Sequence, residues 1–231
     1  MKPSTRKVVT RSPARTVRII NLRGILPHPV EAESSLEADF IRRAALKPAT
    51  SAIVHQPFTL PVSPKGYTPD FLQTLETPTP KIVVEVKLEK KIAEYADLFD
   101  RAAEFLKTSD YTFYVLTERT LRKKKINGRA LLILRYAKAS FSSAERLRVT
   151  ELLGEYSGGL PIGTVIRKAA VSRELVIHLV AWKTLTTGAN LHIDDSAIVM
   201  LQKSVMNNEA FNFEHWFDVS PWGFGRLGAR R

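Results

Sequence analysis

Two acidic residues and a lysine are spaced along consecutive predicted strands as metal-assisted phosphodiester hydrolysis would require. Asp70 belongs to one strand-like run, and Glu85 and Lys87 flank Val86 on the next. Because side chains alternate along a strand, Glu85 and Lys87 share one face, opposite the apolar face of their strand. If the two strands pair as a hairpin, the carboxylate of Asp70 converges on that of Glu85.

These groups could bind a divalent ion. The two carboxylates and the backbone carbonyl of Val86 make an all-oxygen pocket, which Mg²⁺ prefers, with Mn²⁺ as a substitute. A bound water could act as the nucleophile while the ion stabilises the leaving 3′ oxygen. The ammonium group of Lys87 could orient that water and offset charge on the phosphorus oxygens. The spacing therefore predicts catalytic roles for Asp70, Glu85 and Lys87.

A third acid, Glu37, precedes these strands on a predicted helix. It lies near the edge of the helix's apolar face, where it could complete a site for one or two cations. A capping role would also account for it, because Ser34-Ser35-Leu36-Glu37 has the form of a capping box. Glu33 is a rival acid one helical turn earlier. We predict that Glu37 is the third metal ligand, with Asp70 and Glu85.

The elements that must position these residues indicate a mixed α/β domain. Helical spacing of apolar residues and strand-like runs predict three helices and four strands. The helices are expected at 34–47, 88–106 and 127–136, and the strands at 52–62, 67–75, 81–87 and 111–116. The run at 81–87 reads as a half-buried strand. The order helix, antiparallel strands, helix, strand, helix is typical of a small α/β domain.

A second unit is predicted from about residue 142. Ser142-Ser143-Ala144-Glu145 forms another capping box, and three helices should follow one another to about residue 182. Short strands are expected at 183–187 and 191–193, with 198–201 extending the sheet. Three helices followed by a β-ribbon outline a winged helix. We divide the chain into a basic arm (1–30), a first domain (31–138), a winged-helix domain (139–205) and an aromatic and basic tail (206–231).

Four segments resemble the catalytic domain of the TnsA family, the endonuclease subunits of heteromeric cut-and-paste DNA transposases. They are Ser34–Phe40, His55–Phe58, Tyr67–Phe71 and Val84–Lys87, within a similarity that covers about residues 33–138. The resemblance implies a restriction-endonuclease-like fold of the PD-(D/E)xK type, a mixed sheet with flanking helices, followed by a C-terminal winged helix.

The resemblance also implies roles and partners. Glu37, Asp70 and Glu85 would bind Mg²⁺, and Lys87 would be the catalytic lysine. The substrate would be double-stranded DNA at transposon ends, cut at the 5′ ends. A TnsB-like DDE transposase would cut and join the 3′ ends, and a TnsC-like AAA+ ATPase would regulate the reaction.

Composition limits the classes of function. The 231 residues carry a formal net charge of +12, which favours a polyanionic partner through counterion release, although a basic surface can serve solubility alone. The chain has no cysteine, which excludes thiolate zinc sites and agrees with a reducing compartment. Together with the resemblance to the TnsA family, this implies a bacterial cytoplasmic, nucleoid-associated protein. The absence of a long apolar run predicts no membrane partner. No phosphate-binding loop of the Walker type is present, so any ATPase activity should come from a partner.

Several features leave alternatives open. The basic cluster (Arg119, Arg122, Lys123, Lys124 and Lys125) could follow the DNA backbone or form a solvated loop. The helix at 172–183 is mostly apolar, which suits core packing or a protein interface better than base contacts, and we favour protein docking. The tail aromatics could anchor in a partner or cover the chain's own core. The five histidines lack zinc-ligand spacing, and only His55 could flank the site. A stand-alone phage or mobile-element nuclease and a non-catalytic DNA-binding adaptor are the alternative functions.

Overall fold

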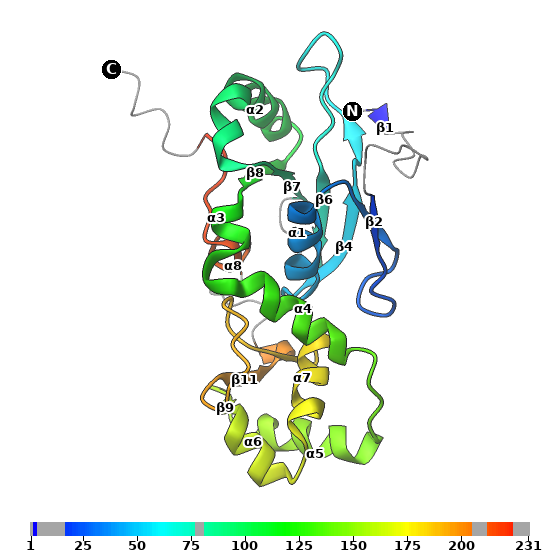
Figure 1. Cartoon of the computed structure of the whole chain (residues 1–231), viewed down its shortest axis with the longest axis vertical. Helices are drawn as coiled ribbons and strands as arrows, with labels where there is room; N and C mark the ends of the chain where they lie inside the picture. Colours follow the sequence, from blue (N-terminus) through cyan, green and yellow to red (C-terminus); the bar gives the residue numbers. More distant parts are fainter. Residues whose placement is uncertain (1, 4–16, 77–80, 205–211, 224–231) are drawn as a thin grey trace, which may run out of the picture. The chain divides into compact units, whose positions relative to one another are not determined.

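The computed structural model describes residues 2–3, 17–76, 81–204 and 212–223 (Figure 1). The chain divides into two compact units, each described by itself below. The first comprises Met1–Ile41, Ala49–Lys123 and Asp218–Arg231, and the second Arg42–Pro48 and Lys124–Phe217. The second unit thus includes the segment from Lys124, which lies before the boundary expected at residue 138.

The first unit is built on a four-stranded mixed sheet, and the predicted mixed α/β class with flanking helices is confirmed. The strand order is β4 (Thr50–His55), β6 (Phe71–Leu75), β7 (Lys81–Val86) and β8 (Tyr111–Leu116). β6 pairs antiparallel with both β4 and β7, so the predicted hairpin is present. β7 and β8 are parallel, and the crossover between them carries η1 (Glu89–Lys91) and α2 (Ile92–Lys107). A parallel pair needs such a crossover.

Helices cover both faces of the central strand β7. Val83 packs in a core cluster with Phe99 of α2. On the opposite face, Phe71 pairs with Val84 and packs against Phe40 of α1 (Ser35–Ala45), with ring centroids 5.0 Å apart. All residues of β7 after Lys81 are therefore buried. The prediction of a half-buried strand was wrong because a second helix covers the face that carries Glu85.

Short elements complete the first unit. β1 (Lys2–Pro3) pairs with β5 (Phe58–Thr59), β2 (Arg18–Ile20) pairs with β3 (Val30–Ala32), and α3 (Glu118–Leu121) follows β8. The strand expected at 52–62 is broken into β4 and β5, because Gln56 adopts a left-handed φ of 43° and Pro57 follows it. Residues 1 and 4–16 of the basic arm predicted at 1–30 lie outside the described residues.

The second unit combines helices with a three-stranded antiparallel sheet. The helices are α4 (Ile126–Tyr136), α5 (Ser143–Gly154), α6 (Ile162–Ala169), α7 (Arg173–Ala181) and α8 (Phe213–Phe217), with the turns η2 (Lys123–Lys125) and η3 (Gln202–Ser204). The sheet order is β10 (Leu185–Thr186), β11 (Ile198–Leu201) and β9 (Leu160–Pro161). The predicted capping box at Ser142 and Glu145 is confirmed.

The strand expected at 191–193 is absent. Leu191 has a φ of 53° and its N–H donates to the Gly188 carbonyl at 2.8 Å, so this segment turns where a strand would extend. Its place in the sheet is taken by β9, which precedes α6 and pairs with β11. β9 has only two residues, so no alternation of apolar and polar side chains could predict it.

Contacts of α7 explain why the segment from Lys124 belongs to the second unit. His178 Nδ1 lies 2.9 Å from the Tyr136 carbonyl, and Trp182 Nε1 donates to the Ala137 carbonyl at 3.0 Å. Residues 175–181 of α7 are all buried. This helix therefore serves packing within its own unit.

The described tail aromatics cover the chain's own core. Phe213, Trp216 and Phe217 of α8 are buried in the second unit, where Trp216 Nε1 donates to the Arg43 carbonyl at 3.2 Å. Trp222 belongs to the first unit, where its Nε1 donates to Asp100 at 2.7 Å. Phe211, Phe224 and the terminal arginines lie outside the described residues. No helix among the described residues combines the length and apolar character needed to cross a membrane.

A buried lysine in the second unit yields a prediction about stability. Lys47 is 2% exposed and its Nζ donates to the Pro48 carbonyl at 3.1 Å. Burial, and then the charge of Lys183, lower the pKa of Lys47 from 10.5 to about 8. The folded state therefore loses this proton at lower pH than the unfolded chain, and the free energy of unfolding should rise between about pH 8 and pH 10.5.

Lys47→Met should remove this rise and increase the free energy of unfolding at pH 7 by about 1–3 kcal/mol. Urea denaturation at pH 7 and at pH 9.5 measures both effects. Lys203→Met, at an exposed lysine of the same unit, is the matched control. An unchanged pH dependence in Lys47→Met would contradict the assignment.

Candidate active site

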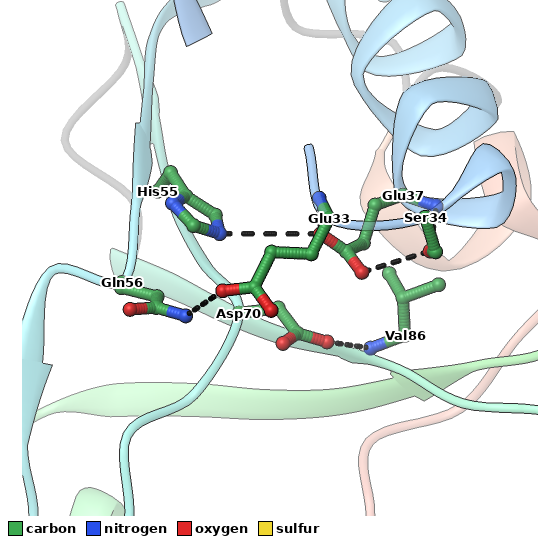
Figure 2. Close-up of polar contacts among 7 residues, drawn as sticks. All are labelled: Glu33, Ser34, Glu37, His55, Gln56, Asp70 and Val86. Carbon is green, nitrogen blue, oxygen red and sulfur yellow. Dashed lines mark hydrogen bonds and ion pairs between the residues drawn. The ribbon is translucent and has the colours of Figure 1, made fainter. Parts of the chain in front are cut away.

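The β6–β7 hairpin brings Asp70 and Glu85 together. Phe71 and Val84 form the last residue pair of the antiparallel ladder, so Asp70 and Glu85 come next in register. Pro69, which has no N–H to donate, precedes Asp70 and helps to end the ladder. The strands separate here, and the side chain of Asp70 replaces a ladder bond: its Oδ2 accepts from the Val86 N–H at 2.8 Å (Figure 2).

Glu85 is held between two donors. It is 3% exposed; its Oε2 accepts from the Tyr67 hydroxyl at 2.7 Å, and its Oε1 lies 2.7 Å from Lys87 Nζ. The ammonium group of Lys87 also lies over the Tyr95 ring, 4.8 Å from its centroid. A cation in this position is attracted to the face of the ring. The predicted shared face of Glu85 and Lys87 is confirmed, and both side chains lie on the face that α2 covers.

Glu37 lies in the first turn of α1 and has the capping role that its sequence position allows. Its carboxylate accepts from the Glu33 N–H at 2.7 Å and from Ser34 Oγ at 2.8 Å, and its own N–H donates to Ser34 Oγ at 3.1 Å. His55 Nε2 lies 3.9 Å from Glu37 Oε2. Figure 2 shows Glu33 and Glu37 at the start of α1 on the side of Asp70. Capping does not remove Glu37 from the acidic group, because its charge acts on Asp70.

Electrostatics shows that the three acids form one group. Burial raises the pKa of Asp70 well above its usual range, and the negative charges of Glu85 and Glu37 raise it further; the Val86 N–H and Lys87 oppose the shift. Burial also raises the pKa of Glu37, with Glu33 and Glu85 adding to the effect. Protons and cations therefore compete for these carboxylates.

Lys87 remains a cation in this environment. Burial acts to lower its pKa, but the charge of Glu85 and its hydrogen bond outweigh burial, and Asp70 adds to the effect. The pKa of Lys87 is consequently raised from 10.5. The ammonium group can therefore stabilise negative charge at neutral pH, but it is not a base there.

The donor set suits a divalent metal ion, although the side chains do not form a finished site. Among the described residues, no three His, Asp or Glu side chains are grouped so that they could hold a metal ion as they stand. Glu85 is engaged by Tyr67 and Lys87. The chemistry nevertheless fits: Glu37, Asp70 and Glu85 offer only oxygen, and their mutual repulsion is what a divalent cation relieves.

Sequence reasoning missed several neighbours of these residues. Tyr67 and Tyr95 contact Glu85 and Lys87, and Gln56 Nε2 donates to Glu33 Oε1 at 2.9 Å. Tyr67 and Gln56 belong to two of the segments on which the predicted family resemblance rests, but a tyrosine and a glutamine carry no spacing signal of their own. Tyr95 carries no such signal either, because an aromatic residue at helical spacing is typical of a buried helix face.

Part of the basic cluster already has protein partners. Arg122 Nε donates to Asp39 Oδ2 at 2.7 Å, and Arg122 Nη2 donates to Ser35 Oγ at 2.9 Å. Lys123 Nζ lies 2.6 Å from Asp218 Oδ2. Arg122 therefore helps to fix the start of α1, the turn that carries Glu37. This structural role was not anticipated from the run of positive charges.

No family model matches the sequence, and no curated protein matches it significantly. The resemblance to the TnsA family therefore remains a prediction from the four segments named above.

Proposed function

We propose that this chain is a metal-dependent DNA endonuclease of the PD-(D/E)xK type. One observation carries the proposal: where the β6–β7 ladder ends, Asp70 and Glu85 are adjacent in register, and Lys87 pairs with Glu85. Glu37 adds a third acid whose charge acts on Asp70. Buried carboxylates whose pKa is raised by neighbouring acids, as at Asp70 and Glu37, are typical of functional sites when they lie beside a lysine.

Each residue has a distinct role in this proposal. Glu37, Asp70 and Glu85, with the Val86 carbonyl, would hold Mg²⁺ or Mn²⁺. The Val86 N–H orients Asp70 through the bond at 2.8 Å. Lys87 orients the attacking water and stabilises negative charge that develops on the phosphoryl oxygens. When bound, the metal ion would supply Lewis-acid polarisation of the scissile phosphate.

We further propose that the chain is the TnsA-like subunit of a cut-and-paste transposase. The second unit supports this proposal through its element order: α5, β9, α6, α7, β10 and β11 follow one another as in a winged helix. A basic chain with a net charge of +12 suits double-stranded transposon ends. The partners would be a TnsB-like DDE transposase and a TnsC-like AAA+ ATPase, and the protein would act in the bacterial cytoplasm at the nucleoid.

The test is strand-specific mapping of breaks at the ends of the element. The chain is combined with the proteins of adjacent reading frames, a donor plasmid and Mg²⁺. We expect breaks at both the 3′ and 5′ ends with the native chain. With Glu85→Gln, we expect breaks at the 3′ ends only.

Two results would contradict parts of this proposal. If Glu85→Gln leaves the number of 5′ breaks undiminished, the chain is not the nuclease that makes them. A stand-alone nuclease would be favoured by two observations together: the adjacent reading frames encode no transposase and no ATPase, and the chain alone nicks plasmid DNA.

A further inference from the structure

The hydroxyl group of Tyr67 reaches the candidate site from inside the core. Tyr67 is 9% exposed, and its ring lies 6.2 Å from that of Phe99 and 6.5 Å from that of Phe113, centroid to centroid. These rings belong to a cluster between α2 and the sheet. A buried phenol nearly always finds a polar partner. Here the partner is the Glu85 carboxylate, at 2.7 Å.

The ring and the hydroxyl of Tyr67 have separate roles, in packing and in hydrogen bonding. The ring contributes packing, which phenylalanine would supply equally. The hydroxyl makes a charge-assisted hydrogen bond to a carboxylate that is almost wholly buried, and such bonds are about twice as strong as neutral ones. Because each carboxylate oxygen carries two lone pairs, Glu85 can accept from Tyr67 and still bind a cation.

The backbone is also fixed where Tyr67 lies. Tyr67 and Leu60 exchange hydrogen bonds between their N–H and carbonyl groups, at 2.9 and 2.7 Å. The phenol is therefore attached to a rigid point between β5 and β6. A donor that cannot drift restricts the orientation of the carboxylate it holds.

We propose that Tyr67 is a positioning residue that orients Glu85 for metal binding through its hydroxyl. The inference rests on the proposed function, since it assumes that Glu85 is a ligand. It assigns to a core tyrosine the hydrogen bond that carboxylate ligands of metals commonly receive from a neighbouring group. Tyr67 itself does not touch the metal or the DNA.

The experiment compares Mn²⁺ binding by Tyr67→Phe, Tyr111→Phe and the native full-length chain, by isothermal titration calorimetry. Tyr111 is the matched control, because its ring packs on Phe58 with centroids 5.7 Å apart and it pairs with Lys81, at the opposite end of β7 from Glu85. We expect Tyr67→Phe to raise the dissociation constant for Mn²⁺ by about 10- to 100-fold. Tyr111→Phe should leave it unchanged.

Thermal unfolding without metal separates positioning from packing. If Tyr67→Phe lowers the melting temperature but binds Mn²⁺ as the native chain does, the tyrosine is structural and the inference is overturned. If the native chain binds no Mn²⁺, the proposed function fails at the same step. The two failures are therefore distinguishable.

A second measurement needs no stable variant at position 67. Labelling tyrosine at Cζ gives one NMR signal for each of the six tyrosines in the chain, and phenylalanine substitution at the other five assigns the signal of Tyr67 by elimination. We expect Mg²⁺ to shift this signal. A signal of Tyr67 that does not respond to saturating Mg²⁺ would contradict the inference.

Discussion

Replacing Asp70 with asparagine is expected to abolish metal-dependent nicking while DNA binding stays nearly intact. The amide oxygen of asparagine can still accept from the Val86 N–H, so the local fold should persist. It lacks the negative charge needed to bind a divalent ion. Mutation of a group that only supports a metal ligand typically lowers metal affinity or activity by about 10- to 100-fold. Loss of a ligand itself should therefore reduce the cleavage rate by more than about 100-fold. Plasmid nicking and fluorescence anisotropy with labelled DNA measure the two effects.

The stability of the same variant provides an independent check. The pKa of Asp70 is raised in the folded chain. At pH values above the usual pKa of a carboxylate, the folded chain therefore binds more protons than the unfolded chain. Stability is therefore lost as pH rises through the pKa of the folded state. Asp70→Asn should melt at a higher temperature than the native chain at pH 7 without metal.

The matched control is Asp97→Asn, the same change at an exposed position of α2, which should alter neither nicking nor stability. Full nicking activity in Asp70→Asn would reject the assignment of the site. A lower melting temperature would indicate that Asp70 is structural.

Removing the ammonium group in Lys87→Met is expected to slow cleavage far more than it weakens metal binding. Loss of one preorganised group that stabilises transition-state charge typically costs about 10²- to 10³-fold. The metal affinity should change much less, because Glu85 keeps its bond to Tyr67. Single-turnover cleavage at saturating Mn²⁺, with calorimetric Mn²⁺ binding, separates the two quantities.

Lys90→Met is the control for charge, since Lys90 is exposed in η1 close to Lys87 in the sequence. Lys90→Met should leave the single-turnover cleavage rate of the bound protein–DNA complex unchanged. Equal losses of metal affinity and cleavage rate in Lys87→Met would contradict a role for Lys87 in the chemical step.

The sequence predicted the hairpin well because its signals are local. Alternation along the predicted strand at 81–87 placed Glu85 and Lys87 on one face, and the preceding predicted strand at 67–75 carried Asp70. The structure pairs these strands and makes Asp70 and Glu85 adjacent in register. The predicted strand at 111–116 coincides with β8 because its branched and aromatic residues strongly favour extended backbone.

Tertiary contacts account for what the sequence did not predict. The burial of Glu85 follows from α2 lying across its face of the sheet, which no local pattern encodes. Tyr67 and Tyr95 looked like ordinary core residues, and only the folded chain shows them against Glu85 and Lys87. The prediction of a strand at 191–193 was wrong because Leu191 adopts a left-handed backbone conformation despite the apolar residues of this segment.

Glu37 illustrates how one residue can satisfy two interpretations. The capping bonds to Ser34 and Glu33 are present, so the local interpretation is correct. The raised pKa of Asp70 also includes the charge of Glu37, so the residue belongs to the acidic group as well. An N-terminal helical turn positions an acid rigidly, which is a useful property in a metal ligand.

Anomalous X-ray diffraction from crystals soaked in Mn²⁺ tests the central claim most directly. We predict one or two anomalous peaks within bonding distance of carboxylate oxygens of Glu37, Asp70 and Glu85, with Lys87 beside them. Peaks only at other acidic residues, or none at saturating Mn²⁺, would contradict the assignment of these carboxylates as a metal site.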